Sequence, residues 1–148
     1  MQARIISNLV VNPLLMTNYS IFLIDDDADD REIITSALTE IDPAVECVTA
    51  TNGREALNRI ISAPMKTDLV ILDLNMPLMN GKEFLKEIQN RKLLSDVPVV
   101  VFTTTLDPVT IEEIKALGVA GYHTKPENYE KLIGTLKNVL QDGNYIQK

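Results

Sequence analysis

The chain alternates short apolar runs with longer amphipathic stretches. Most of the short runs are rich in β-branched residues and end at turn signals, which is typical of buried strands. We predict strands at 20–24, 45–50, 68–73, 98–102 and 120–123. Apolar residues at helical spacing predict helices at 29–41, after Asn52-Gly53, at 82–90, from Asp107-Pro108 to near Gly118, and at 127–140. This alternation predicts an α/β fold of parallel βαβ units with right-handed crossovers, arranged as a three-layer α/β/α sandwich.

Each predicted helix has an apolar face that we expect to cover the sheet. The first helix places Ile33 beside Ile34 on this face, and the second places Ile61 beside Ile60. We expect Val109 to lie inward in the helix that begins at Pro108. These residues define the expected core on the helical side.

The regular pattern occupies residues 19–142, which we expect to form one domain. We expect residues 1–18 to be a poorly ordered or loosely docked extension, since Asn8, Asn12 and Pro13 interrupt their apolar stretch. Arg4 and that stretch weakly match a secretory signal, but no small-residue cleavage site follows. We expect residues 143–148 to be a C-terminal tail. We expect no second domain within these residues.

The composition narrows the class of protein. Hydrophobic residues make up 45% and charged residues 24% of the 148 residues, which excludes a disordered or fibrous chain. A net charge of −7 argues against nucleic acid or an anionic membrane as the main partner. The single cysteine, Cys47, excludes an internal disulfide and a cysteine-based zinc cluster. No apolar stretch approaches the roughly 20 residues that a membrane helix needs, and we expect a cytoplasmic protein.

Polar residues follow four of the predicted strands. Asp25-Asp26 ends the first and Asp73 the third, while Thr103 follows the fourth and Lys125 the fifth. The carboxyl ends of parallel strands meet at one sheet edge, where ligands bind in open α/β folds. Converging carboxylates repel one another unless a divalent cation lies among them, and hard oxygen ligands favour Mg²⁺. With a lysine nearby, Asp73 would suit a carboxylate nucleophile that attacks phosphorus.

Other polar residues near these strand ends have simpler interpretations. We interpret Asp27, Asp29 and Asp30 as solvated acids at a helix start, because acidic residues are favourable there. His123 is the only histidine, and we interpret it as a packed or surface residue rather than a phosphorelay histidine.

Four motifs occur in this order along the chain: Ile24-Asp25-Asp26, Leu72-Asp73-Leu74-Asn75-Met76-Pro77 with Gly81, Phe102-Thr103, and Lys125-Pro126. In order and spacing they resemble the receiver domain of two-component response regulators, over roughly residues 19–142. The resemblance implies a flavodoxin-like, doubly wound five-stranded sheet in the order 2-1-3-4-5.

The resemblance also implies a role for each site residue. Asp73 would accept a phosphoryl group from a histidine kinase. Asp26, Asp73 and the backbone carbonyl of Asn75 would bind Mg²⁺, and Asp25 would act through a metal-bound water. Lys125 would pair with Asp73 before phosphorylation and with the phosphoryl group afterwards. Thr104 departs from the small residue that is usual at its position, and a larger side chain there would restrict access.

The same comparison implies a switch. Thr103 would move to bind a phosphoryl oxygen, and Tyr122 would rotate inward to fill the space. The face formed by the fourth helix, fifth strand and fifth helix would then bind a partner protein, pass phosphate onward, or support a phosphorylation-dependent homodimer. The expected partners are a histidine kinase or phosphotransfer protein and a downstream protein.

We therefore interpret the chain as a single-domain receiver that turns over no separate substrate, and so not as an enzyme. One alternative is a pseudo-receiver, a binding module that works without phosphorylation. The other is a Mg²⁺-dependent phosphatase with an aspartate nucleophile. Such phosphatases need a second acid two residues after the nucleophile, where this chain has Asn75.

Overall fold

A computed structural model describes residues 19–104 and 106–142, so the expected extension at 1–18 and the tail at 143–148 lie outside the described residues. The described part contains strands and helices in strict alternation. In chain order they are β1 Ser20–Ile24, α1 Ala28–Ile41, β2 Glu46–Ala50, α2 Gly53–Ser62, β3 Leu69–Leu72, α3 Gly81–Asn90, β4 Val99–Thr103, α4 Pro108–Ala116, β5 Gly121–Thr124 and α5 Tyr129–Asp142.

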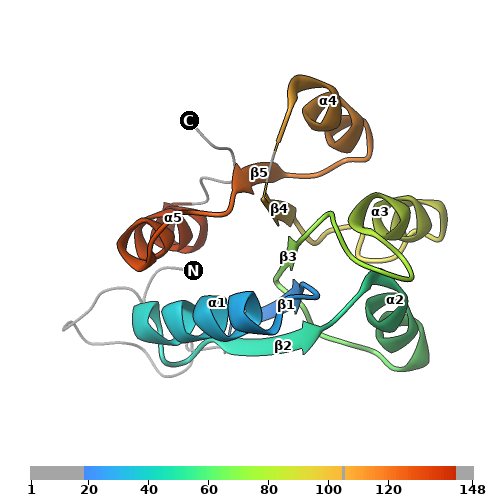
Figure 1. The fold of residues 1–148 in the computed structure, drawn as a ribbon. Helices are drawn as coiled ribbons and strands as arrows, with labels where there is room; N and C mark the ends of the chain where they lie inside the picture. Colours follow the sequence, from blue (N-terminus) through green and yellow to red (C-terminus); the bar gives the residue numbers. More distant parts are fainter. Residues whose placement is uncertain (1–18, 105, 143–148) are drawn as a thin grey trace.

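The strands form one parallel sheet in the order β2-β1-β3-β4-β5. Helices α1 and α5 cover one face, and α2, α3 and α4 cover the other (Figure 1). This arrangement confirms the predicted three-layer α/β/α sandwich and its strand order. The strand order reverses between β1 and β3, which makes their carboxyl ends the expected ligand site.

Alternate residues of each strand enter two separate cores, because successive side chains point to opposite faces of a sheet. Phe22 and Ile24 of β1 pack in the core beneath α2, α3 and α4. Ile21 and Leu23 pack in the core beneath α1 and α5. All residues of β1, β3 and β4 are buried, which explains their nearly continuous apolar sequence.

Side-chain caps fix the starts of α1 to α4, and α5 has a similar cap that is described below. Asp27, Asn52, Asn80 and Asp107 each accept a hydrogen bond from the backbone N–H three residues later. Asn80 also forms a capping box with Glu83. Pro108 follows Asp107 at the first position of α4, as the sequence predicted.

Three apolar residues that we expected to face the core are exposed instead. Ile33 is 44% exposed, Ile61 51% and Val109 70%. Ile33 precedes the inward Ile34 by one position, and Ile61 follows Ile60 by one position. One position corresponds to about 100° around the helix. Val109 lies five residues before the buried Ile114, which places it about 140° away from the inward face. These expectations were wrong because adjacent apolar residues cannot all share one helical face.

Element boundaries differ slightly from the predicted ones. β3 ends at Leu72, which leaves Asp73 as the first residue beyond the strand. α5 begins at Tyr129 instead of 127, since the side chain of Asn128 accepts a hydrogen bond from the N–H of Lys131. Among the described residues, none of the helices combines the length and the apolar sequence that a membrane span requires.

Candidate phosphoacceptor and metal site

Backbone hydrogen bonds fix three of the predicted site residues at the carboxyl edge of the sheet. The N–H of Asp25 donates to the carbonyl of Ala50 at 3.1 Å, and that of Asp73 donates to the carbonyl of Ile24 at 2.9 Å. The N–H of Lys125 donates to the carbonyl of Thr103 at 2.8 Å. Each residue therefore continues the ladder of its strand by one position, and rigid backbone positions its side chain.

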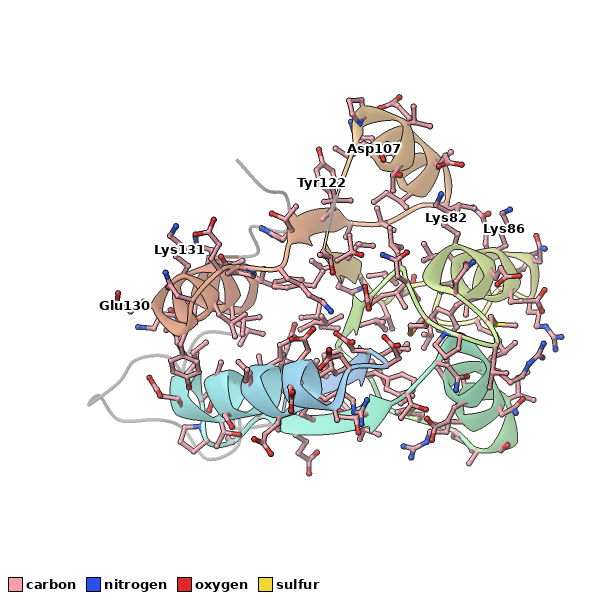
Figure 2. All side chains as sticks on the ribbon, in the orientation of Figure 1. Lys82, Lys86, Asp107, Tyr122, Glu130 and Lys131 are labelled. Atoms are coloured by element: carbon pink, nitrogen blue, oxygen red, sulfur yellow. The ribbon has the colours of Figure 1, made fainter. Side chains whose placement is uncertain are left out.

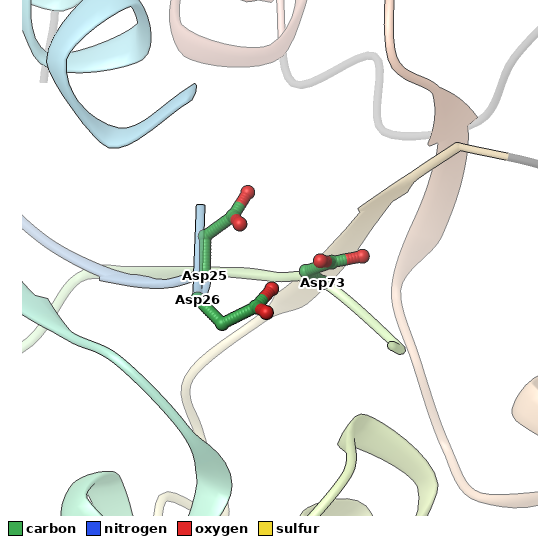
Figure 3. Close-up of side chains that lie close together, drawn as sticks. All are labelled: Asp25, Asp26 and Asp73. Carbon is green, nitrogen blue, oxygen red and sulfur yellow. The ribbon is translucent and has the colours of Figure 1, made fainter. Parts of the chain in front are cut away.

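Asp25, Asp26 and Asp73 converge in space (Figure 3). One oxygen from each carboxylate lies within 4.8 Å of the others. Asp25 and Asp73 are buried, whereas Asp26 is exposed. This combination gives a hard oxygen site that opens to solvent on the Asp26 side, which fits a partly hydrated divalent cation such as Mg²⁺.

The ionised form of Asp25 is disfavoured by its surroundings. Burial raises the pKa of its carboxyl group to about 6, although hydrogen bonds from the N–H of Asp27 and from Lys125 lower it. The nearby Asp73 contributes to the increase. A cation bound among these groups would favour the ionised carboxylate, because it removes the repulsion between them.

Thr103 contacts Asp73 directly. Its hydroxyl group donates to Oδ1 of Asp73 at 3.0 Å, and both side chains are buried. The N–H of Asn75 lies 3.4 Å from the same oxygen. Oδ2 of Asp73 faces Lys125 Nζ at 3.5 Å. Donors therefore surround the oxygens of Asp73, an arrangement that can stabilise negative charge on this group.

Lys125 contacts more carboxylates than the sequence predicted. Its Nζ lies 2.9 Å from Asp25, 2.7 Å from Asp30 and 3.5 Å from Asp73. Burial lowers the pKa of Lys125, but hydrogen bonds to Asp30 and Asp25 outweigh it, and the net shift is upward. The ammonium group is therefore held charged between the first and third strands.

Asp30 is not the solvated acid that its place at a helix start predicts. It forms the shortest ion pair of Lys125 instead. A signal was present: Asp30 lies four residues before Ile34, on the helical stripe that faces the sheet. Asp27 and Asp29 are exposed, as expected for solvated acids, and Asp27 also caps α1.

Gly81 permits close packing behind Asp73. A Cβ atom at this position would lie 2.5 Å from the backbone oxygen of Asp73 and 2.8 Å from Cα of Leu74. The N–H of Gly81 also donates to the carbonyl of Leu74 at 2.9 Å. The glycine thus lets α3 begin directly against the loop that follows β3.

The remaining predicted residues surround the site. Asn75 and Thr104 are exposed. Tyr122 is half-buried and extends from β5 on the side of α4 (Figure 2). His123 is buried, with its ring centroid 5.2 Å from that of Phe102, so it is a packed residue.

Comparison with known proteins gives one consistent result. The family model described as "Response regulator receiver domain" matches residues 21–137. The probable C4-dicarboxylate response regulator DctR of Bacillus subtilis is 33% identical over 130 residues, which cover 88% of this chain and 54% of the relative. The probable transcriptional regulator ycf29 of Pyropia yezoensis is 32% identical over 127 residues, which cover 83% of this chain and 54% of the relative. The chain spans about half the length of these curated relatives.

Solved structures agree with the family model. The phosphorylated cyanobacterial phytochrome response regulator RcpA has 30% identity and a TM-score of 0.76, over 83% of this chain and 94% of that one. The chemotaxis response regulator CheY4 of Vibrio cholerae has 35% identity and a TM-score of 0.70, over 84% of this chain and 100% of that one. Together with the convergence of the four sequence motifs at one sheet edge, these matches establish that the chain belongs to the receiver domain family of two-component response regulators.

Proposed function

We propose that this receiver accepts a phosphoryl group on Asp73, in a Mg²⁺-dependent reaction, from a histidine kinase or phosphotransfer protein. The observation that carries the proposal is the surroundings of Asp73. Its two oxygens face Thr103 and Lys125 respectively, and two further carboxylates lie close enough to share a cation with it. This set combines a nucleophile, donors for the transferred group and a metal site.

The proposed transfer is a displacement at phosphorus. An oxygen of the Asp73 carboxylate forms a bond to phosphorus while the bond from phosphorus to the donor atom breaks. With a phosphohistidine donor, the imidazole nitrogen leaves with the electron pair. Lys125 and the Thr103 hydroxyl group lie where they can bind the transferred oxygens, because both already contact Asp73.

Asp26, Asp73 and the backbone carbonyl of Asn75 would hold Mg²⁺, with Asp25 bound through water. When bound, the ion supplies positive charge that offsets the carboxylates and the phosphoryl oxygens. Asp25 and Asp26 provide negative charge for it, and Asp25 is expected to ionise fully in its presence. The carboxylate cluster supports this assignment.

The output would follow from the contact between Thr103 and Asp73. Phosphorylation adds acceptor oxygens at Asp73, and Thr103 would turn toward one of them. Tyr122 would then rotate inward and change the face formed by α4, β5 and α5 (Figure 2). A downstream protein, a further phosphorelay protein or a second copy would bind this face, and the receiver itself would turn over no separate substrate.

Mass spectrometry of the intact protein tests the proposal. Incubation with Mg²⁺ and acetyl phosphate should add one phosphoryl group, with release of acetate, and chelation of Mg²⁺ should prevent it. Asp73→Asn should gain nothing. No gain in the wild type would favour a pseudo-receiver, whereas continuous release of inorganic phosphate from a generic phosphate ester would favour a phosphatase.

A further inference from the structure

We propose that Asp30 is a positioning residue that holds Lys125 away from Asp73 and so slows phosphorylation. Lys125 Nζ lies 2.7 Å from Asp30 but 3.5 Å from Asp73. The phosphoacceptor therefore has the longest of the three ion pairs of the lysine. This inference rests on the proposed phosphorylation of Asp73.

The ion pair between Lys125 and Asp30 differs from the other two. Asp25 and Asp73 belong to the carboxylate cluster that would share a cation, whereas Asp30 lies outside it. A cation would satisfy the charges of Asp25 and Asp73, but Asp30 would keep its attraction for Lys125. Asp30 is thus the carboxylate that competes for the lysine when the phosphoryl group arrives.

The two residues have room to separate. Asp30 and Lys125 line a cavity of about 280 Å³ between α1 and the start of α5, together with Ile33 and Tyr129. The side chain of Asp30 is 35% exposed, so water can solvate it after the lysine leaves. Movement of Lys125 from Asp30 to a phosphoryl group therefore requires no repacking of the core.

Asp30 also opposes phosphorylation through its charge. Its Oδ2 and that of Asp73 contact the same ammonium nitrogen, so the two carboxylates are close neighbours. A phosphodonor carries negative oxygens, and a like charge beside the acceptor disfavours their approach. Competition for Lys125 and repulsion of the donor act in the same direction.

The test is the rate at which acetyl phosphate phosphorylates Asp73 in matched variants. We expect Asp30→Asn to raise the maximal rate about threefold to fivefold, the size of effect that a partly exposed charge produces. Asp30→Glu keeps the charge and should restore the wild-type rate. Asp29→Asn removes an equal charge from the exposed neighbouring position of α1 and should leave the rate unchanged. Urea unfolding checks that each variant is folded.

The outcomes separate this inference from the proposed function. An unchanged or slower rate in Asp30→Asn overturns the inference alone, provided that the wild type is phosphorylated. Equal acceleration in Asp29→Asn overturns it as well, since the effect would then come from net charge. If the wild type gains no phosphoryl group, the proposed function fails and the inference fails with it.

Discussion

The hydroxyl group of Thr103 donates a hydrogen bond to Oδ1 of Asp73 at 3.0 Å, with both side chains buried. Thr103 is the last residue of β4, and Asp73 directly follows β3, the adjacent parallel strand. The proposed phosphoacceptor is thus joined to β4 before any phosphoryl group is present. A change at Asp73 would therefore act directly on the end of β4.

Replacement of Thr103 by valine should slow phosphorylation without abolishing it. Valine preserves the shape but removes the donor to Asp73, and a hydrogen bond to a charged group contributes about 1.5–3 kcal/mol. We expect a loss of about tenfold or more in the rate with acetyl phosphate, measured by intact mass. Thr103→Ser should retain most of the rate. A wild-type rate in Thr103→Val would show that the hydroxyl group does not assist the transfer.

Alanine at Gly81 should destabilise the protein, because its Cβ would collide with the backbone of Asp73 and Leu74. We expect a loss of about 1–3 kcal/mol in the free energy of unfolding, as for other overpacked positions. Gly134→Ala is the matched control, since apart from its chain neighbours and its own helix backbone no atom of the described residues lies within 4 Å of its Cβ position in α5. That variant should gain up to about 1 kcal/mol. Urea denaturation compares the two, and equal effects would contradict the steric account.

The pH dependence of the unfolding free energy should reveal the raised pKa of the Asp25 carboxyl group. Its pKa is raised to about 6 in the folded protein, so the folded state binds its proton more tightly than the unfolded state does. Without Mg²⁺, this group should therefore stabilise the fold as the pH falls through 6 and destabilise it as the pH rises. We expect the difference in unfolding free energy between Asp25→Asn and wild type to grow by about 1 kcal/mol from pH 5 to 7.5.

Mg²⁺ should reduce this difference, because a bound cation favours the ionised Asp25. Urea titrations of both proteins at each pH, with and without Mg²⁺, measure the effect. A difference that shrinks with rising pH would contradict the raised pKa.

Removal of the Lys125 side chain should leave Asp25, Asp30 and Asp73 without the ammonium group that all three contact. Its side chain is only 17% exposed, and breaking a buried ion pair from one side typically costs about 3–5 kcal/mol. Lys125→Ala should therefore unfold more easily in Mg²⁺-free buffer, although partial exposure reduces the loss below that range. Mg²⁺ should bind this variant more tightly than wild type. Calorimetric titration measures the affinity, and weaker binding would contradict the electrostatic account.

The fold could be predicted because strand and helix periodicities differ along the chain. β1, β3 and β4 are buried on both faces, so their sequences stay apolar. The parallel order then brought Asp25, Asp73 and Lys125 to one edge. Individual helical positions were harder to predict. Ile33 lies beside the inward Ile34 and Val109 lies in the same helix as the inward Ile114, but both are outside the buried stripe.

The contact between Asp30 and Lys125 could not be predicted from local sequence. It joins residues that are 95 positions apart. It depends on how α1 packs beside the end of β5, and an acidic residue in the first turn of a helix is more often solvated. Only its four-residue spacing from Ile34 indicated the inward direction.

The most direct test of the central claim identifies the phosphorylated residue. Protein treated with Mg²⁺ and acetyl phosphate is reduced with borohydride, which converts an aspartyl phosphate to homoserine, and its peptides are sequenced by tandem mass spectrometry. We predict homoserine at position 73, and none when Mg²⁺ is chelated during phosphorylation. Homoserine at position 25 or 26, or at no position, would contradict the assignment of Asp73 as the phosphoacceptor.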